Sequence, residues 1–291
     1  PGPTVEYGAY LLVKGCLRAL PHRAARGVGR RLGDLGWWLD RRHRRVTVDN
    51  LRAAFPELPD AEIARLGREC FRRFGASLTD TVSSTRFDAV DLCRHLTIEG
   101  WEHVEAAEAL GRGVFFLSAH LGLWEIAAYP PGLYGGPLHV VGRPLDNPHL
   151  NRELERLRDR FGNRLIPKRG AARGMLQAIR GGGRVGILID QRVKPNEGIE
   201  VPFFGRPALT SPLLARLVLR TGAPVVPIFG YAEPKGCYRF VARPPILAPE
   251  GVEETDETVA ELTRRYLEAT EAEIRRQPEG WMWMHRRWKR G

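Results

Sequence analysis

The sequence predicts an α/β protein in which a mostly parallel, mixed sheet is flanked by helices and preceded by a helical N-terminal portion. Two observations predict this class. Apolar residues up to about residue 90 recur at helical spacing, and beyond that point short apolar runs alternate with helical stretches. Such alternation is typical of a parallel sheet covered by helices. We therefore expect a helical, membrane-associating portion over 1–90 and an α/β core over 91–291, within one continuous domain.

The first predicted helix is amphipathic. Apolar residues recur at helical spacing over 5–20, basic residues lie off that stripe, and Pro21 ends the helix. The segment is too short for a membrane span, which needs ~20 apolar residues, and no cleavage site of a signal peptide follows it. A basic stretch and then Trp37-Trp38 come next. The helix therefore either lies on a membrane surface or packs on the protein's own core.

The later elements follow from apolar runs, caps and chain breakers. A helix over 46–55 is stopped by Pro56, and Pro59-Asp60 begin another that runs over 61–83. Strands are predicted at 96–99, 113–118, 138–142, 184–189, 223–230 and 237–242. Helices are predicted at 101–110, 121–129, 147–161, 171–180 and 211–221, and a long final helix at 255–276.

The net charge of +11 belongs to the two ends of the chain. Residues 1–52 carry 11 Lys and Arg against 4 Asp and Glu, residues 275–291 carry 6 against 1, and the middle is left at −1. Basic ends suit docking on an anionic surface, such as a membrane or an acidic carrier protein. The near-neutral body counts against a nucleic-acid groove, so we expect no nucleic-acid partner.

Composition and motifs exclude several classes of protein. A chain of 291 residues that is 43% hydrophobic buries a substantial core and is not disordered. Four scattered cysteines without a CxxC pair indicate neither a zinc site nor a disulfide framework, and they favour a reducing compartment. The sequence has no GxSxG elbow, no HExxH motif, no Walker A loop and no dinucleotide fingerprint. We therefore expect no metal and no cofactor.

His120 and Glu125 are the leading catalytic candidates. An apolar run that is typical of a buried strand leads to His120, and Glu125 follows five residues later. Five residues are about one and a half helical turns, so a helix that starts just after His120 brings Glu125 back towards the imidazole. A carboxylate on one ring nitrogen fixes the tautomer and raises the basicity of the other nitrogen. The pair predicts general-base activation of a hydroxyl; a structural histidine is the alternative.

Further candidates follow neighbouring strands, at the edge where open α/β sheets bind ligands. Arg143 comes directly after a predicted strand, Arg158 lies one helix later, and Arg169 belongs to a second basic edge. A guanidinium binds phosphate or carboxylate bidentately. Asp190 ends another predicted strand. We interpret all four as substrate-binding candidates, with a solvated helix face as the alternative for Arg158 and a turn cap as the alternative for Asp190.

The segment 201–205, Val-Pro-Phe-Phe-Gly, is also distinctive. Adjacent phenylalanines between proline and glycine predict a rigid apolar loop. This loop either walls a tunnel for an acyl chain or packs in the core.

Several motifs in order carry a resemblance to a known family. They are Asn50-Leu-Arg-Ala-Ala-Phe-Pro56, His120-Leu-Gly-Leu-Trp-Glu125, Gly142-Arg143-Pro144, Asp190-Gln191, Val201-Pro-Phe-Phe-Gly205 and Pro278-Glu-Gly-Trp-Met-Trp-Met-His285-Arg-Arg-Trp-Lys289. From about Asn50 to the C-terminus the chain resembles the late acyltransferases of lipid A biosynthesis. These are the lauroyl/myristoyl transferases within the lysophospholipid acyltransferase superfamily.

The resemblance implies a glycerolipid-acyltransferase-like fold and O-acyl transfer at the cytoplasmic face of a bacterial inner membrane. His120 would be the general base, and Glu125 would orient it and stabilise its charged form. The acyl donor would be acyl carrier protein or coenzyme A, and the acceptor a hydroxyl of an anionic glycolipid, above all a lipid A precursor. Family positions also nominate Arg158 and Asp190 as functional and place Arg143 near the substrate. No metal or redox cofactor is implied, since the thioester supplies the driving force.

The sequence departs from the family's pattern at two points. Members usually begin with a membrane-spanning helix, whereas this chain has only the short amphipathic segment, so we expect peripheral binding or a truncated start. Arg192 stands where many lipid A enzymes carry a second acid, which leaves another glycolipid, such as phosphatidylinositol mannoside, as an alternative acceptor. Two other functions stay open: a non-catalytic protein that binds anionic membranes, and hydrolysis of the thioester.

Overall fold

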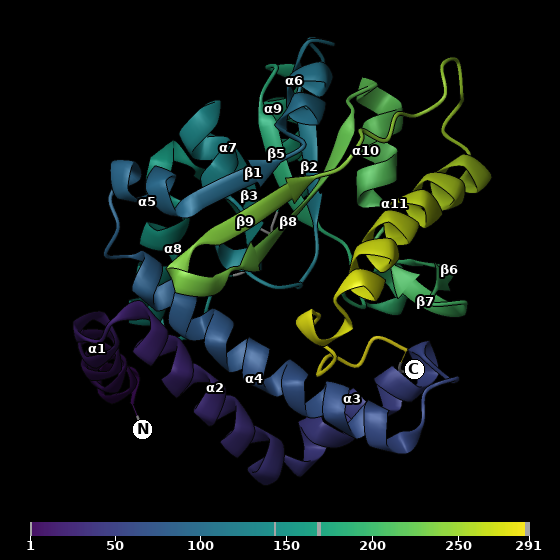
Figure 1. Cartoon of the computed structure of the whole chain (residues 1–291). Coiled ribbons are helices and arrows are strands. Elements are labelled where there is room, and N and C mark those ends of the chain that lie inside the picture. The colour runs from purple at the N-terminus through teal and green to yellow at the C-terminus, as the bar shows by residue number, and fades with distance from the viewer. Residues whose placement is uncertain (1, 143, 168–169, 289–291) are drawn as a thin grey trace.

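The computed structural model describes residues 2–142, 144–167 and 170–288, and it places a helical layer below a sheet (Figure 1). The helical layer consists of α1 (Pro3–Ala19), α2 (His22–Leu39), α3 (Arg41–Ala54) and α4 (Asp60–Ser84), and the short α5 (Ala89–His95) leads to the first strand. Local chemistry sets the boundaries of these helices. Pro21 separates α1 from α2, and the Asp40 side chain accepts the His43 backbone N–H at the start of α3.

The sheet has seven strands in the described part of the chain, in the order β1-β9-β8-β2-β5-β3-β4. They are β1 (Leu96–Glu99), β2 (Val114–Ser118), β3 (Leu138–Gly142), β4 (Arg164–Pro167), β5 (Arg184–Leu188), β8 (Val225–Ala232) and β9 (Tyr238–Ala242). Strands β8, β2, β5, β3 and β4 run parallel, whereas β9 is antiparallel to β8 and parallel to β1. The predicted fold class, a mostly parallel mixed sheet with flanking helices, is confirmed.

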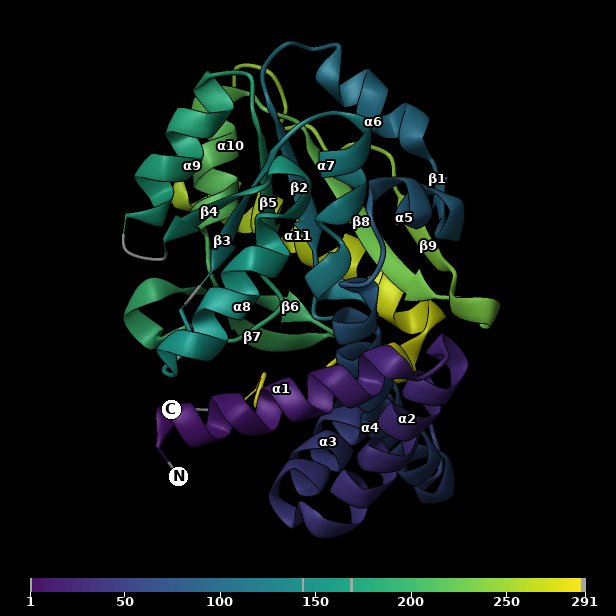
Figure 2. The same cartoon turned by 90° about the vertical axis from the view of Figure 1, so that its left-hand side faces the viewer.

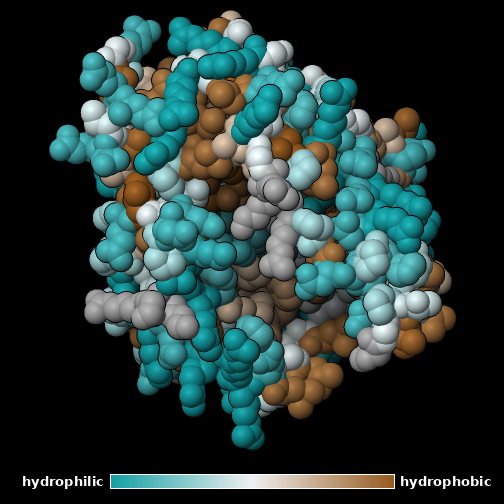
Figure 3. Space-filling model, turned by 180° about the vertical axis from the view of Figure 1, so that it is seen from behind, coloured by the Kyte–Doolittle hydropathy of each residue, from teal (hydrophilic) through white to brown (hydrophobic). Residues whose placement is uncertain are grey.

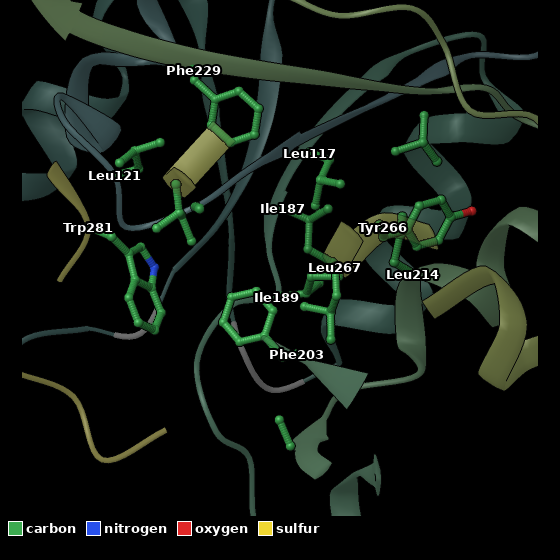
Figure 4. Close-up of a cluster of buried hydrophobic side chains, with 14 of the residues drawn as sticks. Leu117, Leu121, Ile187, Ile189, Phe203, Leu214, Phe229, Tyr266, Leu267 and Trp281 are labelled. Carbon is green, nitrogen blue, oxygen red and sulfur yellow. The ribbon is translucent and has the colours of Figure 1, made fainter. Parts of the chain in front are cut away.

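Both faces of the sheet are covered by helices. These are α6 (Trp101–Glu108), α7 (Tyr129–Tyr134), α8 (Pro148–Arg158), α9 (Ala171–Arg180), α10 (Leu213–Thr221) and α11 (Asp256–Arg276). Phe115 and Leu117 of β2 pack with residues of α9, α10 and α11, while Val114 and Phe116 pack on the opposite face with α6. Figure 4 shows Leu117 beside Ile187 in the first of these clusters. Burial on both faces explains why β2 is a continuous apolar run in the sequence.

Most predicted elements are present. All six predicted strands occur within two residues of their expected ends, and the predicted helix over 171–180 has the observed bounds. The helix predicted over 46–55 begins earlier, at Arg41. Strand β4 was not predicted. The segment predicted as a rigid loop is instead an antiparallel hairpin of β6 (Ile199–Phe203) and β7 (Arg206–Thr210), and it stands apart from the main sheet.

The prediction of a helix over 121–129 is wrong. This segment holds only the single turn η1 (Trp124–Ile126) before α7. The physical reason is that its backbone is committed elsewhere: the Gly122 N–H donates to the Gly280 carbonyl, and its neighbour's N–H also bonds outside the segment. A residue whose N–H is bonded to a distant chain segment cannot contribute that N–H to a helix.

Helices α2 and α4 cross closely because both carry glycine at the contact. Gly33 of α2 faces the backbone carbonyl of Phe71 in α4, and Gly75 of α4 faces the carbonyl of Gly29 in α2. A Cβ on Gly33 or Gly75 would collide with a backbone oxygen of the other helix. Small residues at a contact let two helix backbones approach tightly, so these glycines set the position of α2 on the core.

We expect Gly33→Ala to lower the midpoint of thermal unfolding. The added methyl group meets the backbone of α4, and overpacking of this kind costs about 1–3 kcal/mol. Gly27→Ala in the same helix is the matched control, because nothing lies within 4 Å of a Cβ there. Alanine there favours the helix by roughly 0.5–1 kcal/mol. Circular dichroism melts of both variants test this, and equal midpoints would contradict the close crossing.

Candidate active site

His120 and Asp190 stand at the carboxyl ends of two neighbouring parallel strands. Ser118 at the end of β2 pairs with Leu188 at the end of β5, and the two polar residues each come two positions later. The parallel register therefore places them level with each other. The Asp190 carboxylate accepts a hydrogen bond from His120 Nδ1 at 2.9 Å and another from the His120 backbone N–H at 2.9 Å.

The contact with Asp190 decides the chemistry of the imidazole. A carboxylate only accepts hydrogen bonds, so the neutral ring of His120 holds its proton on Nδ1 and its lone pair on Nε2. Burial by itself lowers the pKa of His120, but the charge and hydrogen bond of Asp190 outweigh burial and raise this pKa above its ordinary value. The His120 side chain remains 23% exposed. The ring is therefore a strengthened base that a ligand can reach.

Asp190 is a buried charge with several donors. Its side chain is 1% exposed, and Oδ2 accepts the indole N–H of Trp281 at 2.7 Å in addition to the His120 backbone N–H. Burial alone raises the pKa of Asp190; the charge of His120 and these hydrogen bonds outweigh burial and lower the pKa to about 2. Asp190 therefore stays ionised at neutral pH and is a permanent partner for the histidine.

The C-terminal segment, residues 281–288, crosses the same strand edge. Its Met282 N–H donates to the His120 carbonyl at 3.0 Å. Nε2 of His285 accepts the Arg192 backbone N–H at 3.0 Å, and burial lowers the pKa of His285. His285 is therefore a neutral imidazole whose proton is on Nδ1.

The loop after His120 is held by backbone contacts that need a glycine. Gly122 has a φ of +58°, and a Cβ there would collide with the carbonyl oxygen of Gly230. Its own carbonyl accepts the Ser77 hydroxyl of α4 at 2.9 Å. The close approach that this glycine permits is thus to the protein's own backbone, and it fixes the chain just beyond the histidine.

Glu125 lies elsewhere than the sequence led us to expect. It is in η1 and pairs with Arg158 at the end of α8, with both carboxylate oxygens 3.2 Å from Nη2. The carboxylate that bonds His120 is Asp190, not Glu125. After burial and Asp190, the charge of Glu125 also raises the pKa of His120, and Arg158 opposes it. The structure thus brings together four of the predicted site residues, His120, Glu125, Arg158 and Asp190. It pairs His120 with Asp190 and Glu125 with Arg158, instead of His120 with Glu125.

Two predicted residues cannot be placed. Arg143 and Arg169 lie outside the described residues, so their part in substrate binding stays a prediction. Arg158 itself packs over Gly142 at the end of β3, where a Cβ would collide with the guanidinium. In the described ranges, no group of three or more His, Cys, Asp or Glu side chains is placed to hold a metal ion.

An apolar groove of about 1200 Å³ begins at this edge and runs between α1, α2, α4 and α8. Figure 2 shows α1 crossing below α8. Glu125, Met282 and His285 line the groove at its catalytic end. The apolar walls include Val13, Leu17, Leu32, Leu78, Leu154 and Leu157. Pockets for small ligands usually measure about 300–1,000 Å³, so this groove is large enough for a lipid chain.

The outward faces of α1 and α2 are apolar and uncovered. Val5 and Leu12 of α1 and Leu35 and Leu39 of α2 are each more than half exposed. The polar side of α1 faces the protein instead, since Lys14 pairs with Glu153 of α8. Hydrophobic surface also gathers around the lower part of the face in Figure 3. The first helix therefore packs on the protein through Leu17, while much of its apolar stripe stays exposed. No helix in the described residues combines the length and hydropathy needed to cross a membrane.

The phenylalanines at 203 and 204 belong to the core. They are 0% and 5% exposed, and both pack against the C-terminal tryptophans Trp281 and Trp283. Neither lines the apolar groove as the described residues form it. Of the two alternatives for this segment, core packing is the one that the structure supports.

The sequence analysis did not predict the contacts of Trp281 and His285 with the site. A signal was present: the C-terminal run places two tryptophans and a histidine within five residues. A buried indole N–H needs an acceptor, and Asp190 supplies it here. The partnership of Asp190 with His120 was also missed, although both residues follow strands that turned out to be neighbours.

The chain is similar to known proteins along almost its whole length. The family model described as bacterial lipid A biosynthesis acyltransferase matches residues 4–290. The lipid A biosynthesis lauroyltransferase of Escherichia coli is 27% identical over 274 residues, which cover 93% of this chain and 87% of that protein. The palmitoleoyltransferase of the same organism is 26% identical over 276 residues, or 93% of this chain and 86% of that protein.

A third relative has another acceptor in its name. The phosphatidylinositol mannoside acyltransferase of Mycobacterium tuberculosis is 26% identical over 194 residues, which cover 66% of this chain and 59% of that protein. All three names describe acyl transfer; two of them name lipid A and the third names phosphatidylinositol mannoside.

We expect Asp190→Asn to lower the pKa of His120. The substitution removes the negative charge that favours the imidazolium and leaves burial, which disfavours it. Nuclear magnetic resonance titration of the His120 ring in the wild type and the variant measures this shift. Glu125→Gln is the matched control and should shift the same pKa less, because Glu125 bonds Arg158. A larger effect of Glu125→Gln would contradict the assignment of Asp190 as the partner.

Proposed function

Because the chain belongs to the bacterial lipid A biosynthesis acyltransferase family and is an acyltransferase, we propose that it moves a fatty acyl chain from a thioester to a hydroxyl of an anionic glycolipid. One observation carries the proposal. A strengthened, reachable imidazole stands where a large apolar groove ends: Met282 lines the groove and bonds the His120 carbonyl. A base beside a lipid-sized groove suits a reaction between an acyl chain and a lipid hydroxyl.

His120 is the general base of the proposed reaction. Its Nε2 takes the proton of the acceptor hydroxyl as the oxygen attacks the thioester carbonyl. The tetrahedral intermediate then collapses, the carbon–sulfur bond breaks, and the thiolate receives the proton from His120. Asp190 is the positioning residue, because it holds Nδ1 and stabilises the imidazolium that forms. Since the reacting form is the neutral ring, the rate should rise as the pH passes upward through the pKa of His120.

Arg158 supplies positive charge to the acceptor side of the site. Its guanidinium is held by Glu125, which lines the groove, and 16% of the Arg158 side chain is exposed. A fixed guanidinium suits the phosphate of an anionic lipid. Glu125 is therefore proposed to act through Arg158 and, by its charge, on His120. Arg143 and Arg169 are proposed to contribute further positive charge to substrate binding.

The proposed acceptor is a lipid A precursor. The lauroyltransferase and palmitoleoyltransferase relatives support it, since both carry lipid A in their names and match over most of their length. Phosphatidylinositol mannoside is the second candidate, supported by the mycobacterial relative. The proposed donor is an acyl thioester on acyl carrier protein or coenzyme A.

The proposed location is the cytoplasmic face of the bacterial inner membrane, with peripheral attachment through α1 and α2. The apolar groove is lined by both helices, and their exposed apolar residues lie on the outside of the same layer. A lipid acceptor that enters from the bilayer then remains in apolar surroundings throughout. Exposed leucines on basic helices are typical of attachment to a membrane surface.

The test of the function is transfer itself. Purified protein with acyl-acyl carrier protein or acyl-CoA and a panel of glycolipids should yield an acylated lipid, read by mass spectrometry. We expect His120→Ala to lower the rate of transfer at least about 10²-fold, because the general base is lost. His120→Asn retains a donor towards Asp190 and guards against loss of folding, and it should be as inactive.

Three outcomes would contradict the proposal. A wild-type protein that acylates no glycolipid from either thioester would remove the function. Thioester hydrolysis that exceeds transfer while a good acceptor is present would make water the acceptor. Full activity of His120→Asn, with an unchanged melting temperature, would remove His120 from the chemistry.

We expect Leu12→Glu/Leu35→Glu to weaken binding to vesicles that contain anionic phospholipid. A buried leucine contributes about 1.5–3 kcal/mol, so the double variant should partition at least about tenfold less in co-sedimentation. Val90→Glu/Leu110→Glu is the matched control, since Val90 is 61% and Leu110 44% exposed away from α1 and α2. Equal loss in both double variants would argue against attachment through these helices.

A further inference from the structure

A second groove, of about 560 Å³, is lined by arginine side chains from three separate elements. The arginines are Arg41, Arg42 and Arg45 of α3, Arg206 at the start of β7 and Arg286 of the C-terminal segment. All five are exposed. Asp49 is the single acidic side chain that the described chain contributes to this lining. We call this feature the basic groove.

The five arginines form no ion pair among the residues that the structure describes. By contrast, Arg72 of α4 pairs with Asp34, and Arg264 of α11 pairs with Glu261. Like charges gathered in one concave surface repel each other and focus a positive potential there. The arrangement gives the protein no internal stabilisation, but it attracts a ligand of the opposite charge.

The basic groove adjoins the proposed active site through a shared wall. Met284 and His285 line the apolar groove, while the next residue, Arg286, lines the basic groove. Asn50, in the lining of the basic groove, donates to the carbonyls of Trp283 at 2.8 Å and His285 at 2.7 Å. Only the chain segment 284–286 therefore separates a ligand in the basic groove from the apolar groove.

We propose that the basic groove docks an acidic protein that carries the acyl chain on a flexible thioester arm. The inference rests on the proposed function and adds the surface that recognises the donor. Docked there, the carrier stays in solvent while its arm passes the wall at 284–286 and delivers the chain to the apolar groove. The two basic ends of the sequence supply the recognition, since α3 and Arg286 come from the regions with net charges of +7 and +5.

The shape of the groove favours a protein over a bilayer. A bilayer surface is flat, whereas these arginines surround a hollow whose walls come from α3, the hairpin and the C-terminal segment. The exposed leucines of α1 and α2 are not part of its described lining. A nucleotide would need an enclosed slot for its base, but the charged side chains here are all exposed. An acidic helix of a carrier protein fits such an open, concave, positive surface.

The test uses Arg41→Glu/Arg42→Glu/Arg45→Glu in the full chain. Glutamates at 41 and 42 are favourable in the first turn of α3, and Arg45 in the second turn is exposed, so α3 should remain folded. The KM for dodecanoyl-acyl carrier protein should rise at least about tenfold and lose its dependence on salt, while the KM for dodecanoyl-CoA should rise less than about threefold. Arg94→Glu/Arg112→Glu/Arg180→Glu is the matched control, with the same change of charge on exposed arginines elsewhere.

A direct binding measurement separates this proposal from the proposed function. Acyl carrier protein without an acyl chain should bind the wild type and the control in isothermal titration calorimetry, and the α3 variant at least about tenfold more weakly. If wild type binds the carrier but transfers nothing, the function fails and the docking surface stands. Equal binding by both triple variants overturns the docking surface. So does an equal rise in KM for both donors, which would indicate a phosphate site, or a loss confined to binding of anionic vesicles.

Discussion

The buried carboxylate of Asp190 is the interaction on which the rest of the site depends. It accepts hydrogen bonds from the ring and backbone of His120 and from the indole of Trp281, so it joins β2, β5 and the C-terminal segment. A buried charge is tolerated only when donors replace its lost hydration. The same contacts fix the tautomer of the histidine and raise its basicity. The Asp190 carboxylate therefore both holds these three segments together and prepares His120 to act as a base.

The C-terminal segment has a second role as a divider. Its tryptophans close the core beside Phe203, and its backbone bonds the His120 carbonyl. On one side Met284 faces an apolar groove, and on the other Arg286 faces a basic one. A lipid chain and a charged carrier need opposite surroundings, because an acyl chain gains free energy only away from water while arginines pay heavily for leaving it. The C-terminal segment therefore keeps the apolar groove and the basic groove adjacent but separate.

Much of the fold was predictable from local pattern. Strands buried on both faces appear as continuous apolar runs, and caps and prolines mark the helices, so six strands and most helices were found within a few residues. The predictions failed where tertiary bonds override local preference. In the segment after His120, the N–H groups of Gly122 and Leu123 donate to the carbonyls of Gly280 and Gly230, so this segment does not form a helix. The hairpin at 199–210 hides its pairing because proline and phenylalanine resemble a rigid loop.

The sequence by itself determined the family, the parallel sheet and the residue types of the site, since these follow from motif order, periodicity and chemistry. Only the tertiary structure decided which side chains of the site bond to each other. Glu125 is five residues from His120 but bonds Arg158, whereas Asp190, 70 residues away, bonds the imidazole. The reason is the strand order: β2 and β5 are neighbours, and no local signal encodes which strands pair. Likewise, the basic ends were visible as charge, but only folding placed α3 and Arg286 around one groove.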